Sequence, residues 1–99
     1  MTLIKIVLNQ LLSNTATRAC GATFRDLLLK HVMDNTVVEI DFTGTNLTPS
    51  FADEAFGLLC HHLSIHQFNK HIKCRQLLEP QKELLKRVIG NRFNGKTSS

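Results

Sequence analysis

The chain has 99 residues, the size of one compact domain, so it has room for one hydrophobic core and no second domain. Hydrophobic residues at 42% and charged residues at 20% argue against disorder and coiled coil, and no run approaches the roughly 20 apolar residues of a membrane span. The net charge of +4 permits attraction to nucleic acids, but the absence of Trp and Tyr argues against a single-strand binder.

The first third of the chain predicts a strand and a helix. Residues Leu3–Leu8 form a β-branched run typical of a largely buried strand. Apolar residues recur at three- and four-residue intervals over Arg18–Met33, which predicts an amphipathic helix with Thr15 or Thr17 as its N-cap. Within it, Gly21 indicates close backbone packing against the sheet.

The middle of the chain predicts a second strand and helix. Side chains of residues Thr36–Phe42 are predicted to point alternately to the two faces of a strand, so Val38, Ile40 and Phe42 share one face. After a loop, Thr48-Pro49-Ser50 begins a helix that extends to Leu63, because Pro is tolerated in a first turn. Either Ser50 or Thr48 is the expected N-cap, with a capping-box-like pair between Ser50 and Asp53.

The last third predicts a strand over Lys70–Leu77 and a helix that begins at Glu79-Pro80 and stops at Gly90-Asn91. Residues 92–99 are then a flexible polar tail, and residues 1–91 form the domain. Alternating strands and helices predict an α/β fold, in which helices cover mainly one face of a small parallel or mixed sheet. Ligands of such sheets favour the loops after strands, here Asp41–Ser50.

Two segments carry a family resemblance. Val37–Gly44 and Thr48–Leu59 resemble the STAS-like domains, relatives of the sulphate-transporter and anti-sigma-factor-antagonist modules. The chain also resembles a small bacterial and phage subfamily of largely uncharacterised function, and this likeness extends over Thr17–Leu63. The resemblance implies a STAS-like β-α-β-α-β-α fold.

The resemblance also implies a phosphorylation switch. In the antagonists, a kinase-like anti-sigma factor phosphorylates a Ser at the start of the helix after the central strand, and Ser50 matches that position. The chain reads Thr48-Pro49-Ser50-Phe51, where the antagonists have an acidic residue, two small hydroxyl residues and a glycine. Ser50 and Thr48 are thus the phosphoacceptor candidates, against the simpler hypothesis that they only cap the helix.

The expected function is a non-enzymatic regulatory module that binds a protein partner, which the resemblance implies is a histidine-kinase-type ATPase. The alternative is an inhibitor or immunity protein, of a phage or toxin system, that blocks a target enzyme. Partner contacts are expected from the exposed side of helix Phe51–Leu63 and from six residues: Asp41, Thr43, Thr45, Asn46, Asp53 and Glu54.

Histidines and cysteines suggest a metal site, because His62 and His66 are four residues apart on one predicted helix, next to Cys60, with Cys74 as a further ligand. Partly buried histidines near a helix end explain the pattern more simply, so no metal and no cofactor is expected. All three cysteines lie in apolar patterns suited to buried thiols, which argues against nucleophilic catalysis.

The same cysteines are an odd set with no close pair, which favours a reducing cytoplasm over a secreted protein with disulfides. Basic residues gather in the last third of the chain, from Lys70 to Lys96, but Glu79 and Glu83 interrupt them. A solvated helix face explains this pattern, so nucleic acid is not the expected partner.

Overall fold

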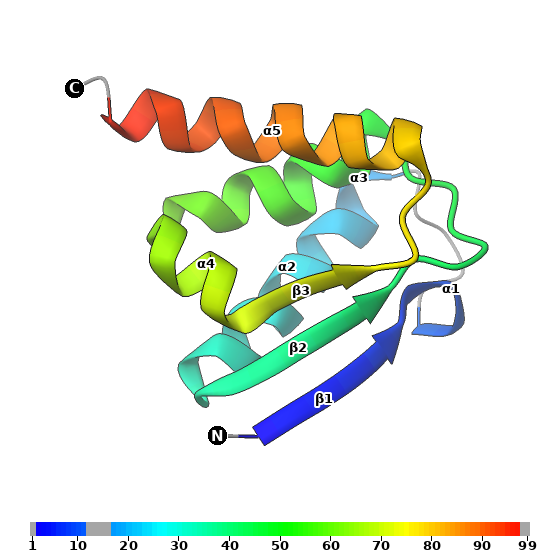
Figure 1. The fold of residues 1–99 in the computed structure, drawn as a ribbon, viewed down its shortest axis with the longest axis horizontal. Coiled ribbons are helices and arrows are strands. Elements are labelled where there is room, and N and C mark those ends of the chain that lie inside the picture. Colours follow the sequence, from blue (N-terminus) through cyan, green and yellow to red (C-terminus); the bar gives the residue numbers. More distant parts are fainter. Residues whose placement is uncertain (1, 12–16, 98–99) are drawn as a thin grey trace.

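The computed structural model describes residues 2–11 and 17–97 and has the predicted α/β fold (Figure 1). Each predicted strand is present, and so is each predicted main helix. In chain order the elements are β1 (Thr2–Val7), α1 (Leu8–Leu11), α2 (Arg18–Met33), β2 (Thr36–Asp41), α3 (Pro49–Ala52), a π-helical stretch η1 (Asp53–Gly57), a 3-10 stretch η2 (Leu58–His61), α4 (Ile65–His71), β3 (Ile72–Arg75) and α5 (Glu79–Thr97).

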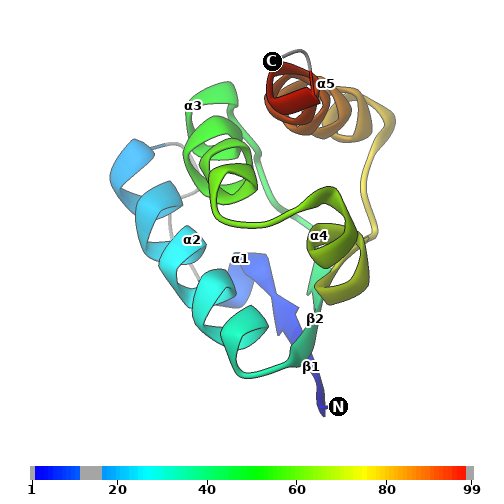
Figure 2. The same cartoon turned by 90° about the vertical axis from the view of Figure 1, so that its left-hand side faces the viewer.

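The sheet has three parallel strands in the order β1-β2-β3. Because both crossovers step in the same direction, right-handed connections place their helices on the same side. Figure 2 shows α2 on one side of the sheet, and none of the described helices covers β1 and β2 on the other. On that open face, Lys5 pairs in register with Glu39, and Glu39 pairs with Lys73. The predicted small sheet covered mainly on one face is confirmed.

Strand β1 is more exposed than its apolar sequence predicts. It pairs with β2 alone among the described strands, and Leu3 is 55% exposed. Only Ile4 and Ile6 pack against the core, and both are half-buried. The expectation of a largely buried strand is therefore wrong, because β1 is an edge strand with one face in solvent.

Aromatic side chains form the centre of the core. Phe24 of α2 lies 6.2 Å from Phe51 and 6.0 Å from Phe56 between ring centroids, and Phe56 lies 6.1 Å from Phe42. Phe42 follows Val38 and Ile40 on the buried face of β2, as the alternation predicts. These rings join the sheet to the helices.

Helix α2 begins as predicted, because the Thr17 side chain accepts a hydrogen bond from the Cys20 N–H at 3.2 Å. The other suggested cap, Thr15, lies outside the described residues. Gly21 does allow a close approach, but the expected partner is wrong. A Cβ there would lie 2.8 Å from Glu54 Cβ and 3.0 Å from the Phe51 carbonyl oxygen, so Gly21 packs against α3 and η1 and not against the sheet.

Elements α3, η1 and η2 follow one another without a break from Pro49 to His61. This helical segment lies between α2 and α5, and α5 packs on it (Figure 2). Its apolar residues from Phe51 to Cys60 are buried except Leu58, which is half-buried. Two helices therefore cover most of the segment that sequence reasoning expected to offer an exposed partner surface.

Helix α4 is absent from the sequence-based expectations. The Ser64 hydroxyl accepts a hydrogen bond from the Gln67 N–H at 3.1 Å, and the Gln67 side chain accepts one from the Ser64 N–H at 3.0 Å. Because this capping box begins α4 at Ile65, Lys70 and His71 lie in the last turn of the helix and not in the strand predicted for them. The third strand is thus shortened to Ile72–Arg75.

Helix α5 does not stop at Gly90 but continues to Thr97, so the predicted start of the tail at Arg92 falls inside a helix. Phe93 is buried and meets Phe68 of α4 edge to face at 6.1 Å. Burial of this ring offsets the cost of about 1 kcal/mol for a glycine inside a helix. Over the described residues, no helix is long and apolar enough to cross a membrane.

Candidate functional site

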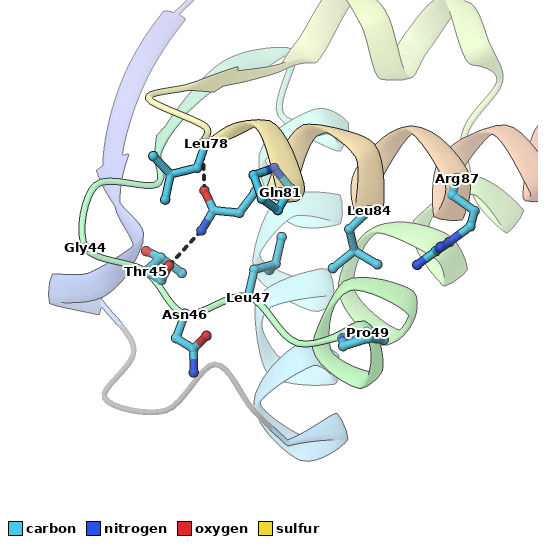
Figure 3. Close-up of a pocket in the computed structure, with 10 residues that line it drawn as sticks. Gly44, Thr45, Asn46, Leu47, Pro49, Leu78, Gln81, Leu84 and Arg87 are labelled. Atoms are coloured by element: carbon cyan, nitrogen blue, oxygen red, sulfur yellow. Dashed lines mark hydrogen bonds between the residues drawn. The ribbon is translucent and has the colours of Figure 1, made fainter.

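The region after β2 forms a groove with the start of α5, which we call the helix-start groove (Figure 3). Its volume is about 480 Å³. Arg87 is the one charged side chain among the described residues that line it. The lining comes from the β2–α3 connection, from the first residue of α3, and from α5 with the residue before it: Gly44, Thr45, Asn46, Leu47, Pro49, Leu78, Pro80, Gln81, Leu84 and Arg87.

The loop that enters the groove is fixed by Asp41 at the end of β2. One oxygen of its carboxylate accepts hydrogen bonds from the Thr43 N–H at 2.8 Å and from the Thr43 hydroxyl at 2.6 Å. These bonds stabilise the charged form, so they lower the pKa of Asp41 from its ordinary value. The next turn closes when the Thr45 N–H donates to the Phe42 carbonyl at 3.0 Å.

Gly44 sits at the tip of this turn with a φ of 70°. Residues with a Cβ pay a steric cost in that left-handed conformation, and glycine does not. A Cβ at this position would also lie 3.2 Å from the side-chain nitrogen of Asn9 in α1. The turn therefore requires a glycine for its conformation and for its packing on α1.

Gln81 holds the loop against α5. Its side-chain N–H donates to the Thr45 carbonyl at 2.7 Å, and its side-chain oxygen accepts from the Leu78 N–H at 3.0 Å (Figure 3). The side chain is buried, so the bond to Thr45 is shielded from water, whereas the bond from Leu78 is only partly buried. Sequence reasoning missed this residue, although a Gln at the third position of a helix is a known partner for the N–H at its start.

The two phosphoacceptor candidates have different roles at the start of α3. Thr48 is the N-cap, because its hydroxyl accepts a hydrogen bond from the Phe51 N–H at 3.2 Å. Ser50 lies in the first turn and is half-buried. The predicted pair between Ser50 and Asp53 is wrong: Thr48 caps the helix, and Asp53 bonds elsewhere.

Asp53 and Glu54 are engaged by arginines of neighbouring helices. Arg92 of α5 donates to Asp53 at 2.9 Å, and Arg25 of α2 donates to Glu54 at 2.7 Å. Arg18 also lies 3.7 Å from Asp53 and 3.5 Å from Glu54. These two carboxylates therefore join α2, η1 and α5, which leaves them less available to a partner than their sequence suggested.

The six expected partner residues fall into separate places. Thr45 and Asn46 line the helix-start groove, and the buried hydroxyl of Thr45 has no hydrogen-bond partner among the described residues. Asp41, which binds Thr43, lines a smaller hollow of about 270 Å³ on the open sheet face. Asp53 and Glu54 lie in the ion pairs above. Of the six, the structure thus places only Thr45 and Asn46 at the helix-start groove.

The suggested metal ligands are not brought together either. His62 follows the end of η2 and His66 belongs to α4, so they do not share a helix, and both are exposed. Cys60 is buried, and its thiol donates to the Phe56 carbonyl at 3.2 Å. Across residues 2–11 and 17–97, no three His, Cys, Asp or Glu side chains are placed to hold an ion.

Cys74 offers no activated nucleophile. Burial raises the pKa of its thiol to about 11, against a smaller opposite effect from the neighbouring Arg75. At neutral pH the thiol is therefore protonated, and the thiolate is the reactive form.

A family model described as a STAS-like domain of unknown function (DUF4325) matches residues 21–82, well over half of the chain. The matched stretch runs from α2 into the first turn of α5 and includes the whole β2–α3 connection. No curated protein and no solved structure matches the chain.

Proposed function

Because the chain belongs to the family of STAS-like domains of unknown function, we propose that it is a non-enzymatic regulatory module that binds a protein partner through the helix-start groove. One observation carries the proposal. Hydrogen bonds that Asp41 accepts from Thr43 and that Gln81 donates to Thr45 fix the shape of the groove, yet Leu78 on its rim is 68% exposed. A preformed groove with exposed apolar atoms reduces the entropy cost of binding.

The lining indicates what the partner presents. Leu47, Leu84 and Leu78 favour an apolar segment, and Arg87 at the end of the groove favours a carboxylate beside it. In the proposed system the partner is a histidine-kinase-type ATPase, which supplies the nucleotide. The chain itself contributes shape and charge but no chemistry, and it acts in the cytoplasm, where its three free cysteines stay reduced.

Ser50 is the proposed switch. A phosphate there would lie at the positive end of the helix dipole at the start of α3. The acidic neighbours Asp53 and Glu54 oppose it less than their sequence suggests, because Arg92 and Arg25 pair with them. A phosphate next to Pro49, which lines the groove, would repel a partner carboxylate that pairs with Arg87.

The test is affinity purification of the tagged chain from cells of its origin, with mass spectrometry of partners and of phosphorylation. We expect an ATPase to co-purify with the natural sequence and to be lost with Leu78→Asp and with Arg87→Glu. Leu3→Asp is the matched control, because Leu3 is also exposed but lies in β1, outside the groove. Equal recovery with all the variants would contradict the proposed surface.

The switch has its own test with the purified partner. Ser50→Asp is expected to weaken binding and Ser50→Ala to leave it close to normal. The switch is wrong if both variants bind within about 0.5 kcal/mol of the natural sequence, because a phosphate-like charge in an interface costs more than that. Recovery of an unrelated enzyme, without phosphate on Ser50 or Thr48, would instead favour an inhibitor or immunity protein.

A further inference from the structure

A second groove runs between α4 and α5, and we call it the α4–α5 groove. Its volume is about 410 Å³. Phe68 of α4 and Phe93 of α5, in contact at 6.1 Å, contribute buried rings to its wall. Leu85 and Ile89 line it from α5, and Ile65, which is 56% exposed, lines it from α4. Neither the family match nor the proposed partner surface accounts for this apolar hollow.

Gly90 keeps this groove open. It lies inside α5 without a positive φ, so the backbone does not require a glycine there. An added Cβ would meet nothing within 4 Å in the part of the chain that the structure describes. A glycine inside a helix costs about 1 kcal/mol relative to Ala, and no contact among the described residues explains it. What its absent side chain provides is free space in the wall of the groove.

The charges at the groove have one sign. Among the described residues that line it, the charged side chains are Lys82 and Lys86, one helical turn apart on α5. Lys82 lies 3.3 Å from Glu79, but both side chains are well exposed, so this pair is weak and easily exchanged. The groove is therefore apolar inside and positive along one side.

We infer that the α4–α5 groove binds an acidic amphipathic helix of a protein partner. Apolar side chains at positions i, i+3 or i+4 and i+7 of that helix fill the space between Phe68 and Gly90, and its carboxylates pair with Lys82 and Lys86. The positive charges of Lys82 and Lys86 favour an acidic partner, because opposite charges complement each other across an interface. The open groove between two helices favours a helical partner. This inference does not rest on the helix-start groove, which lies on other residues of α5.

The probe is a fluorescein-labelled peptide of about 18 residues, roughly 27 Å as a helix, with Leu at those positions and Glu elsewhere. Its matched control has Gln in place of every Glu. Fluorescence anisotropy is expected to show a Kd about tenfold higher for the Gln peptide than for the Glu peptide. Equal binding of the two peptides would overturn the inference.

Variants locate the binding. Gly90→Leu is expected to weaken binding of the Glu peptide about tenfold or more while the protein stays folded, because Leu favours a helix more than Gly does. Lys86→Glu is expected to weaken it about tenfold, whereas Lys5→Glu, an equal change of charge on β1, leaves it within about twofold. Unchanged affinity in Gly90→Leu or in Lys86→Glu would overturn the inference.

Two other occupants are separate outcomes. If dodecanoate binds in a Gly90→Leu-sensitive manner and the Glu peptide does not bind, the groove takes a fatty-acid anion and the inference is wrong. If sedimentation shows a dimer that Gly90→Leu dissociates, and the peptide does not bind, the groove is an interface between copies of this chain and the inference is again wrong.

Discussion

Helix α5 shapes two grooves that differ in how they are held open. Its first turn and Leu84 line the helix-start groove, where polar bonds from Gln81 fix a loop. Leu85, the very next residue, lines the α4–α5 groove, which packed apolar side chains and the bare Gly90 shape instead. The comparison shows that adjacent apolar residues of one helix serve different surfaces, so α5 cannot be understood as a helix with a single core face.

Phe93→Ala tests the apolar packing that shapes the α4–α5 groove, and it has the largest expected effect on stability. The ring is buried against Phe68, so its removal should lower the free energy of unfolding by about 3 kcal/mol. Urea denaturation followed by circular dichroism measures it. A loss below about 0.5 kcal/mol, the range of an ordinary surface change, would mean that residues after Gly90 do not belong to the core.

Gln81→Leu tests the hydrogen-bonded side. It removes the donor to Thr45 and the acceptor for Leu78, and the buried carbonyl of Thr45 loses its partner. We expect a loss of about 2 kcal/mol by the same denaturation. Gln81→Glu keeps the acceptor for Leu78 but places a carboxylate oxygen against the Thr45 carbonyl, so at neutral pH it should destabilise the protein at least as much as Gln81→Leu. If Gln81→Leu were neutral, these bonds would not hold the loop.

Gly44→Ala should destabilise the protein by about 1 kcal/mol or more, because it forces a side chain into a left-handed turn and against Asn9. Paired denaturation curves of Gly44→Ala and the natural sequence give the value. A more stable variant would show that the turn does not need its positive φ.

Gly90→Ala should have the opposite sign. It relieves a helix-interior glycine where an added Cβ meets open space, so we expect a gain of about 0.5 to 1 kcal/mol. The thermal midpoint should rise by several degrees in a domain of this size. Destabilisation would mean that the wall of the α4–α5 groove is closed at Gly90.

Lowering the pH should produce the smallest change in stability, through protonation of Asp41. Its pKa is lower in the folded chain than in the unfolded one, so its contribution to stability is present above the ordinary carboxyl pKa near 4 and is lost as the pH falls through the lowered value. Thr43→Val removes the hydroxyl bond, so its stability should depend less on pH in that range. Parallel pH dependence of the two proteins would exclude this role for Thr43.

Local signals in the sequence predicted much of the fold. The start of α2 at Thr17 and the buried face of β2 both follow from spacing within a few residues. Helix α4 was missed because its seven residues carry too short a periodic pattern, although Ser64 and Gln67 mark its start. The end of α5 was missed because the burial of Phe93 against Phe68 overrides the glycine.

The candidate site was predicted in part. The loop after β2 was identified from its position at the end of a strand, and Thr45 and Asn46 do line the groove. Contacts between residues far apart in the chain lay beyond the sequence pattern. Gln81 binds a carbonyl 36 positions away, and Arg92 reaches Asp53 across 39 positions. No local spacing predicts such pairs.

The central claim is that a protein partner binds the helix-start groove, and photo-crosslinking tests it most directly. A photoreactive phenylalanine analogue at Leu78 is compared with the same analogue at Leu3, an exposed leucine on the edge strand. The account predicts one dominant crosslinked protein from position 78 that is absent from position 3 and is lost with Arg87→Glu. Crosslinks of equal yield from both positions, or from position 3 alone, would contradict it.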